Sequence, residues 1–410
     1  MAKSNRPVAC NIVMGKSDLI TEKLSQAKAQ VKRSGIGAWV IFVRETCQGS
    51  DPCLPLILEG SLTWLSALIV SGAGETVAIV GNYDADPLID SGNWDKVVPY
   101  VQDIKPHLLE VLESCVPHGA PIGLNYSLSD DKADGITHGM WLLFQSMLEG
   151  TRFEGSTVSA ENVAKSLRSQ KSQEEIRRIK AAIAEGDRLF QDIARFAKKG
   201  VSEAEVQRHV HQIIAERGLG FAWDPVGDPI VNSGPESSIG HGIPSENIRL
   251  EEGHVFHVDL GVQSEGYCSD VQRCWFVGDA VPNDVVQALQ AVNNAIDSAA
   301  ATLLPGVQGW QVDKSARDSI VASGYEEYHH AVGHQVGRLA HDGGTTLAPR
   351  WARYGDSPYG QVQENEVYTL ELGVVLKDRG YIGIEEMVVV TPDGCEYLTE
   401  RQLTMPLVGR

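Results

Sequence analysis

The chain has 410 residues, of which 42% are hydrophobic and 22% are charged, as in ordinary globular proteins. At roughly 150 residues per domain, this length predicts two or three domains with sizeable cores. The formal net charge is −19, from 54 acidic and 35 basic residues, and no cluster of Lys and Arg stands out. This balance excludes a surface built for nucleic acid or anionic membranes, because both are bound through basic patches.

The cysteines and the N-terminal sequence bear on the cellular compartment. The seven cysteines are odd in number and form no CxxC pair, which predicts free thiols in a reducing compartment. The N-terminal stretch lacks the basic segment and apolar core of a secretory signal. No uninterrupted apolar run reaches the length of about 18 residues that a membrane span needs. We therefore expect a cytoplasmic protein.

The first part of the chain alternates predicted helices and strands. Apolar periodicity predicts these elements in chain order: a helix at 17–34, a strand at 37–43, a hairpin of 64–72 and 75–81, a strand at 97–101, a helix at 104–115, a strand at 121–126 and a helix at 129–148. This alternation predicts an α/β domain over residues 1–165. We find no Gly-rich phosphate-binding loop in it.

The second part begins with a long helix, for which Ser172 and Glu175 resemble a capping box. Two predicted helices are followed by two apolar strands, VFHVDLGV and YCSDVQRCWFVG. Two further helices, at 284–303 and 309–323, precede the strands VYTLELGVVL and YIGIEEMVVVT. This order predicts an α+β domain over residues 166–410 in which helix, helix and hairpin occur twice.

The first hairpin carries two acids, Asp259 and Asp270. A turn at Ser264-Glu265 would place them directly opposite each other. Directly opposed residues have Cβ atoms about 4.5–5.5 Å apart, so two carboxylates there repel. Because both strands are apolar, either a raised pKa on one acid or a bound cation must offset the repulsion.

The second hairpin repeats the arrangement with Glu371 and Glu385, centred on Asp378. Strand alternation could turn one or two of these four acids outward, but four acids in apolar strands are hard to explain as solvated surface. His334 lies between Gly333 and Gly337, which allow the backbone to approach a site closely. Carboxylates with an imidazole suit Mn, Co, Fe or Zn. Four carboxylates exceed the needs of one simple zinc site and suit two bridged ions, which activate water and polarise a carbonyl.

The motifs HGIP, DLG…SD, HxxGHxxG, TLELG and IEEMVVVT occur in this order. Together they resemble the pita-bread metallopeptidases, which include methionine aminopeptidase, Xaa-Pro aminopeptidase, Xaa-Pro dipeptidase (prolidase) and creatinase. The resemblance covers about residues 165–405, and ten residues between the two Asp ligands make it highly specific. The domain before it resembles the N-terminal domain of the prolidase and creatinase branch in its pattern and length. The implied fold is an α/β N-terminal domain followed by a pita-bread domain with pseudo-twofold duplication.

The resemblance implies two divalent metal ions, for which we expect Mn, with Co or Zn as alternatives. It assigns one ion to Asp259, the other to His334 and Glu371, and both to Asp270 and Glu385. Glu385 matches the family's ligand, so the adjacent Glu386 should point to the opposite face.

The resemblance also implies catalytic and substrate-binding residues. Glu371 is the expected general acid and base. His330 and His341 match the family's substrate-handling histidines, one of which can hydrogen-bond the scissile carbonyl or the oxyanion. His241 matches the histidine near the substrate's N-terminal residue or amide nitrogen, although by itself it would be taken for a hydrogen-bonded loop histidine.

One position departs from the family pattern. Proline-specific relatives usually carry an Arg two positions before the last ligand Glu, and here that residue is Gly383. Tyr381 or Arg379, from the same strand, could reach into the site instead. The departure concerns fine specificity more than hydrolysis.

The expected function is hydrolysis of Xaa-Pro dipeptides by a homodimer. An Xaa-Pro aminopeptidase acting on longer peptides is the alternative. Methionine aminopeptidase lacks an N-terminal domain of this type, and creatinase works without metal. A non-catalytic pita-bread binding module is a remote alternative, because such modules have lost ligands and all five are present here.

Overall fold

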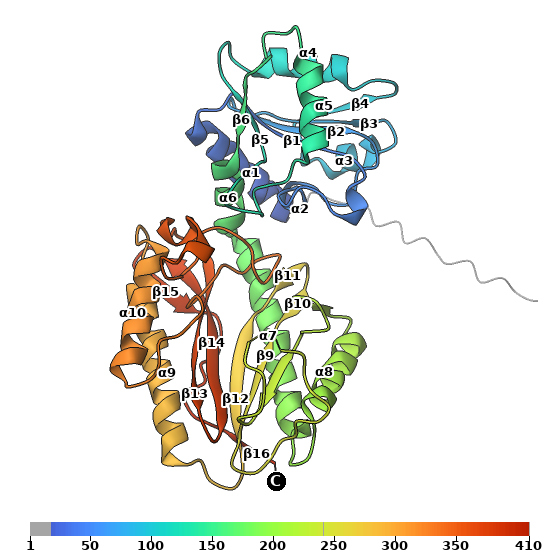
Figure 1. Cartoon of the computed structure of the whole chain (residues 1–410). Coiled ribbons are helices and arrows are strands. Elements are labelled where there is room, and N and C mark those ends of the chain that lie inside the picture. Colours follow the sequence, from blue (N-terminus) through green and yellow to red (C-terminus); the bar gives the residue numbers. More distant parts are fainter. Residues whose placement is uncertain (1–17, 241, 410) are drawn as a thin grey trace, which may run out of the picture. The chain divides into compact units, whose positions relative to one another are not determined.

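The computed structural model describes residues 18–240 and 242–409 (Figure 1). The chain divides into two compact units. The first comprises the residues up to Ser127 together with Ala133–Leu167, and the second comprises Leu128–Lys132 together with Arg168–Arg410. Within the described ranges, every helix is too short or too polar to cross a membrane.

The first unit is built on a mixed six-stranded sheet with the order β4-β3-β2-β1-β5-β6. Its strands are β1 (Ala38–Val43), β2 (Ser66–Ser71), β3 (Thr76–Gly81), β4 (Lys96–Tyr100), β5 (Ile122–Leu124) and β6 (Thr157–Ser159). β2 pairs antiparallel with both β1 and β3, while the outer pairs are parallel. The predicted hairpin is therefore present as β2 and β3.

Helices cover both faces of this sheet, which explains why its central strands are apolar throughout. One face packs against α1 (Asp18–Ser34), α2 (Leu54–Ile57), α3 (Ala85–Ser91) and α6 (Glu161–Ser169), the other against α4 (Lys105–Cys115) and α5 (His138–Leu148). In β1, Trp39 and Ile41 enter the first core, whereas Val40 and Phe42 enter the second.

The helix predicted over 129–148 is shorter than expected, because α5 begins only at His138. The Thr137 side chain accepts a hydrogen bond from the Met140 amide and caps the helix there. The preceding loop is held by the Gly135 amide, which donates to the Asn125 carbonyl at 3.0 Å. The polar stretch 160–172, which precedes the long helix, contains α6.

The second unit contains two helix pairs and two large hairpins. The helices are α7 (Gln173–Phe196), α8 (Glu203–Arg217), α9 (Asn283–Thr302) and α10 (Gly309–Ala322). The strands of the first half are β7 (Gly220–Phe221), β8 (Ile230–Ser233), β9 (Val255–Leu260), β10 (Val262–Ser264), β11 (Tyr267–Cys268) and β12 (Val271–Val277). Those of the second half are β13 (Val367–Leu376), β14 (Gly380–Thr391) and β15 (Gly394–Tyr397), with β16 (Leu407–Val408) pairing back to β12. The repeated order of helix, helix and hairpin is therefore present.

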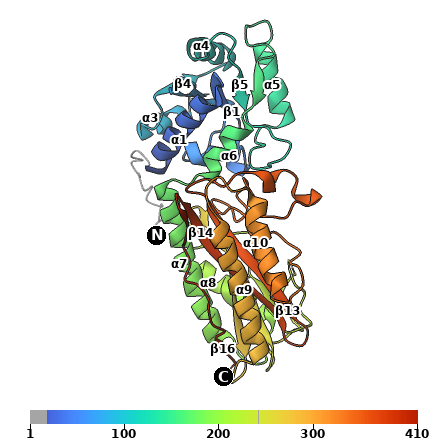
Figure 2. The same ribbon diagram turned by 90° about the vertical axis from the view of Figure 1, so that its left-hand side faces the viewer.

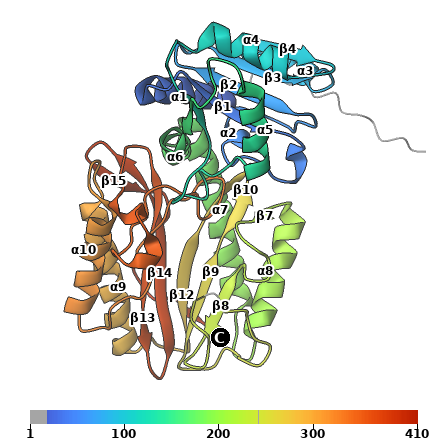
Figure 3. The same cartoon turned by 45° about the horizontal axis from the view of Figure 1, so that its top comes forward.

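The helices of the second unit begin as the sequence predicts. Ser172 and Glu175 form a capping box at the start of α7, and Ser202 and Glu205 form another at the start of α8. Gly218 ends α8 with a φ of 65°, a conformation that glycine adopts without strain. Figure 3 shows α8 running beside β8.

The packing of α9 and α10 decides which side chains of the second hairpin face the site. Figure 2 shows both helices in front of β13. Leu370 and Leu372 of β13 and Ile384 of β14 lie in the hydrophobic core formed with these helices. Because strand side chains alternate between faces, Glu371 and Glu385 point away from that core.

Candidate metal centre

The first hairpin has a different register from the predicted one. β9 and β12 place Asp259 opposite Gln272 rather than opposite Asp270. The turn lies at Glu265 and Gly266, whose φ angles are 50° and 77°, one residue later than expected. The pairing is shifted by two residues, so Asp270 still shares the face of Asp259, as its diagonal neighbour.

The second hairpin has the predicted register. Glu371 and Glu385 are directly paired between β13 and β14. The Glu385 side chain is 1% exposed and that of Glu371 17%. Two neighbouring carboxylates with so little contact with water are unfavourable unless protons or a cation compensate their charge.

His334 approaches both hairpins from the segment that precedes β13. Its backbone is held by Thr369, whose side-chain oxygen accepts from the His334 amide at 3.2 Å and whose amide donates to the His334 carbonyl at 2.9 Å. The imidazole Nε2 lies 3.7 Å from an Asp270 oxygen, 3.5 Å from a Glu371 oxygen and 4.0 Å from a Glu385 oxygen. One nitrogen therefore faces three carboxylates that come from two hairpins.

The donor atoms of this cluster fit a divalent cation. Ligand atoms of Asp270, His334 and Glu385 all lie within 4.8 Å of one another. Among the described residues, Asp259 Oδ1 and Glu385 Oε2 are buried without a hydrogen-bond partner. Buried polar atoms are normally paired, and a metal ion would satisfy carboxylate oxygens left in this way. Oxygen donors with one imidazole suit Mn, Co or Zn.

The protonation states follow from burial and crowding. Burial raises the pKa of Asp270 well above its ordinary value, and the charges of Asp259 and Glu371 raise it further. Burial also raises the pKa of Glu371, to about 7, against the hydrogen bond from Gln272. Burial and the neighbouring His341 lower the pKa of His334 to about 3, so the imidazole is neutral and can bind a metal.

A second layer of side chains that the sequence analysis missed orients Glu371. Gln272 Nε2 donates to a Glu371 oxygen at 3.0 Å, and Gln272 Oε1 lies 3.1 Å from His257 Nε2. His257 Nδ1 in turn lies 3.1 Å from Asn232 Oδ1. A signal was present in the sequence, because His257 and Gln272 alternate with the apolar residues of their strands on the same face as Asp259 and Asp270.

The opposite face of the same strands is braced by a buried ion pair. Glu386 points away from the site, as expected, and one of its oxygens lies 3.0 Å from Arg273 Nη2. Arg273 also donates to the carbonyls of Glu385 at 2.9 Å and Glu400 at 2.7 Å. The guanidinium thereby ties β12 to β14 directly behind the carboxylates.

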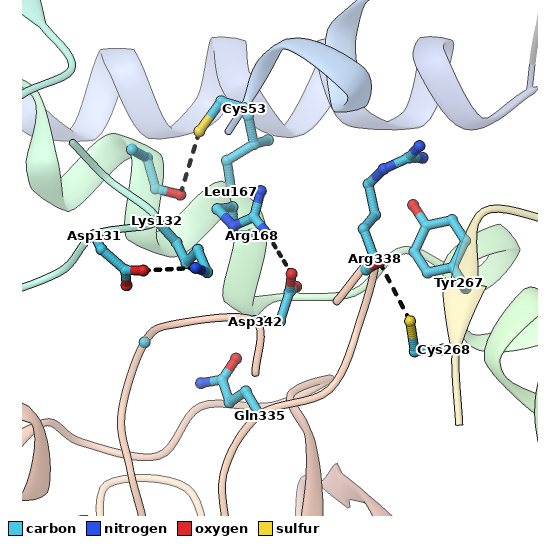
Figure 4. Close-up of polar contacts among 12 residues, drawn as sticks. Cys53, Asp131, Lys132, Leu167, Arg168, Tyr267, Cys268, Gln335, Arg338 and Asp342 are labelled. Atoms are coloured by element: carbon cyan, nitrogen blue, oxygen red, sulfur yellow. Dashed lines mark hydrogen bonds and ion pairs between the residues drawn. The ribbon is translucent and has the colours of Figure 1, made fainter. Parts of the chain in front are cut away.

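The three histidines expected to handle substrate lie in different settings. The His341 ring packs edge-on against His334, with the centroids 4.3 Å apart. The next residue, Asp342, is buried between Arg168 and Lys171, which both form ion pairs with its carboxylate. Figure 4 shows the pair with Arg168. His330 is exposed, and its ring centroid lies 5.7 Å from that of Tyr328. His241 lies outside the described residues.

Comparisons with known proteins agree with this geometry. The model of metallopeptidase family M24 matches residues 177–392. The uncharacterized peptidase YqhT of Bacillus subtilis is 31% identical over 268 residues, which cover 65% of this chain and 71% of that protein. An Xaa-Pro dipeptidase of Pyrococcus horikoshii is 31% identical over 251 residues, which cover 59% of this chain and 66% of that protein.

A solved structure supports the fold across both units. The X-Pro aminopeptidase from Thermotoga maritima MSB8 matches with a TM-score of 0.68 and 24% identity, covering 94% of this chain and 99% of that chain. The predicted fold, an α/β domain followed by a pita-bread domain, is confirmed. The family implies divalent metal ions and peptide substrates. Because the family model matches more than half of the sequence, this chain belongs to metallopeptidase family M24.

Proposed function

We propose that this metallopeptidase hydrolyses the Xaa-Pro bond of dipeptides, as a prolidase does. The observation that carries the proposal is the convergence of His334 Nε2 on carboxylates of Asp270, Glu371 and Glu385. The relative from Pyrococcus horikoshii, an Xaa-Pro dipeptidase, supports the substrate class. We also propose that the protein is a homodimer and lies in the cytoplasm.

The proposed ligands divide between two ions. Asp259 would hold one ion, His334 and Glu371 the other, and Asp270 and Glu385 both. Such a pair of ions supplies an activated water and polarises the scissile carbonyl. Mn is the first choice, with Co or Zn as alternatives.

The protein's own groups hold and move the protons. Glu371 would take a proton from the attacking water and pass it to the leaving nitrogen, as a general acid and base does. Gln272 fixes the orientation of one Glu371 oxygen during this transfer. One of His341 and His330 would donate a hydrogen bond to the carbonyl oxygen as its negative charge grows. A prolyl nitrogen carries no hydrogen, so its protonation is the step that such a site must supply.

An Xaa-Pro aminopeptidase that acts on longer peptides is the second candidate. One observation favours it, because Arg379 is turned away from the site. Its Nε lies 2.6 Å from Asp284 Oδ2, and its Nη1 donates to the Gly253 carbonyl at 3.1 Å. With Gly383 two residues before Glu385, this strand offers no cation to bind the terminal carboxylate of a dipeptide.

The test is hydrolysis of Ala-Pro and Ala-Pro-Ala by the purified, Mn-loaded protein, with Ala-Ala as the non-proline control. The Glu371→Ala variant, prepared in the same way, reports contaminating peptidases. Release of alanine from Ala-Pro alone is the expected result for a dipeptidase. Release from Ala-Pro-Ala would move the assignment to an aminopeptidase, and cleavage of Ala-Ala alone would exclude proline specificity.

A further inference from the structure

Two glycines face each other on the site side of the second hairpin. Gly373 and Gly383 are paired between β13 and β14, adjacent to the pair of Glu371 and Glu385. A Cβ atom on Gly383 would lie 2.4 Å from Cε1 of Tyr381. A Cβ atom on Gly373 would lie 2.4 Å from both Cζ and Oη of the same ring. The Tyr381 ring therefore lies directly on both glycines and occupies the space that any side chain at position 383 would need.

The same ring packs against the side chains that orient Glu371. Its centroid lies 5.0 Å from that of His257, in an edge-to-face arrangement. A Cβ atom on Gly383 would also lie 2.8 Å from Gln272 Oε1 and 2.9 Å from His257 Nε2. Tyr381 thus belongs to the wall of the site on the side of Glu371, and not to the hydrophobic core behind the hairpin.

The hydroxyl of Tyr381 is hydrogen-bonded to that of Tyr328. The Tyr328 ring stands next to His330, one of the residues expected to handle substrate. The loop that carries Tyr328 and His330 is held by Arg317, which donates to both of their carbonyl oxygens and is itself paired with Asp313. Two phenols and an imidazole therefore form a fixed row that begins beside Glu371.

The two phenol hydroxyls of this row carry no charge. A guanidinium binds a carboxylate through two parallel hydrogen bonds and with charge, so it discriminates strongly for a free C-terminus. A phenol hydroxyl donates or accepts a hydrogen bond without charge, so it discriminates between an amide carbonyl and a carboxylate much less than a guanidinium does. Tyr381 and Tyr328 are both residues of intermediate solvent exposure.

We propose that the hydroxyl pair of Tyr381 and Tyr328 contacts the carbonyl group of the residue that follows the scissile bond, and that it sets a specificity independent of a free carboxylate. The substrate class is then Xaa-Pro units whose prolyl carbonyl belongs to an amide as well as those in which it belongs to an acid. This inference rests on the proposed function and adds the residue that recognises the leaving group.

The test compares Ala-Pro with its C-terminal amide, Ala-Pro-NH2, using the Mn-loaded wild-type protein and three variants. Wild type should hydrolyse the two with kcat/KM values within about tenfold of each other. Tyr381→Phe should lower kcat/KM about tenfold on both, mainly through KM, the effect of one lost hydrogen bond to bound substrate. Tyr328→Phe should act in the same direction, and the double variant should lose little more, because the two hydroxyls act as a unit.

Tyr325→Phe is the matched control, since Tyr325 lies three residues before Tyr328 and outside the pair; its kcat/KM should be unchanged. Metal content should also stay unchanged in Tyr381→Phe, because the phenyl ring still covers Gly373 and Gly383. A wild-type preference for the free acid above about 100-fold, as an ionic contact would give, overturns the inference. Unchanged kcat/KM in both single variants would overturn the inference and leave the proposed function intact. If wild type hydrolyses neither substrate, both the inference and the proposed function are wrong.

Discussion

The two hairpins both place a pair of carboxylates on the site face, but their strands pair in different registers. In the β13–β14 hairpin, Glu371 and Glu385 are direct partners. In the β9–β12 hairpin, Asp259 and Asp270 are diagonal neighbours, and the position opposite Asp259 belongs to Gln272. That position allows Gln272 to reach across to Glu371 on the other hairpin. The two halves of the duplication therefore differ, because one supplies Glu371, the proposed general acid and base, and the other supplies the Gln272 amide that orients it.

The largest effect is expected when Glu371 is neutralised without a change in its size. Glu371→Gln should lower kcat on Ala-Pro by about 10³-fold, because the general acid and base is lost. The control is Glu396→Gln, an exposed residue of β15, which should keep wild-type kinetics. A loss of less than about tenfold would contradict the role of Glu371.

The buried ion pair of Arg273 and Glu386, which ties β12 to β14, should contribute strongly to the free energy of unfolding. Arg273→Met removes the partner of the fully buried Glu386 and three backbone hydrogen bonds, and it should lower the free energy of unfolding by about 3 kcal/mol. Urea denaturation measures the change. Arg208→Met, which breaks an exposed pair with Glu246, is the matched control and should have little effect. Equal losses in the free energy of unfolding would mean that the buried ion pair stabilises the protein no more than the exposed one.

In the metal-free protein, the four closely spaced carboxyl groups should make the free energy of unfolding depend on pH. The pKa of Glu371 rises from 4.5 to about 7 in the folded protein, so its contribution to stability is full below pH 4.5 and is lost as the pH rises through about 7. Between pH 6.5 and 8, the unfolded His334 imidazole loses its proton while the folded one is already neutral, so it opposes this trend by about 0.4 kcal/mol. Glu371 alone should thus lower the stability of the metal-free protein by about 1 kcal/mol across this window, before the smaller opposing contribution of His334 is subtracted.

Thermal unfolding at a series of pH values, with chelator and with Mn added, measures this dependence. Mn should abolish or reverse the slope, because it binds the charged carboxylates and favours the loss of their protons. A metal-free protein whose stability rises with pH over this window would show that the acids are not crowded as the structure has them.

The smallest expected effect concerns the turn that sets the register of the first hairpin. Gly266 has a φ of 77°, so Gly266→Ala should cost about 1 kcal/mol in the free energy of unfolding. Gly394→Ala is the control, because a Cβ atom there meets nothing within 4 Å and its φ is not left-handed. Comparable thermal midpoints for the two variants would indicate that the turn adapts and that the register is set elsewhere.

The sequence by itself determined the elements and the face on which the acids lie. Apolar periodicity predicted the helix pairs and hairpins, and the capping box at Ser172 predicted the start of α7. The alternation of strand side chains placed Asp259 and Asp270 on one face even though the predicted turn was wrong by one residue. A register change of two residues preserves the face, and this is why the candidate ligand set did not depend on the turn.

Only the tertiary structure decided what surrounds those acids. The partner of Asp259, the contact of Gln272 with Glu371, and the outward direction of Arg379 depend on how separate strands and loops meet. The Tyr381 ring covers Gly373 because their strands are paired, which no local pattern contains. Periodicity reports burial along one element, whereas these contacts join residues that lie far apart in the chain. The candidate ligands could therefore be predicted from the sequence, and the groups that surround and orient them could not.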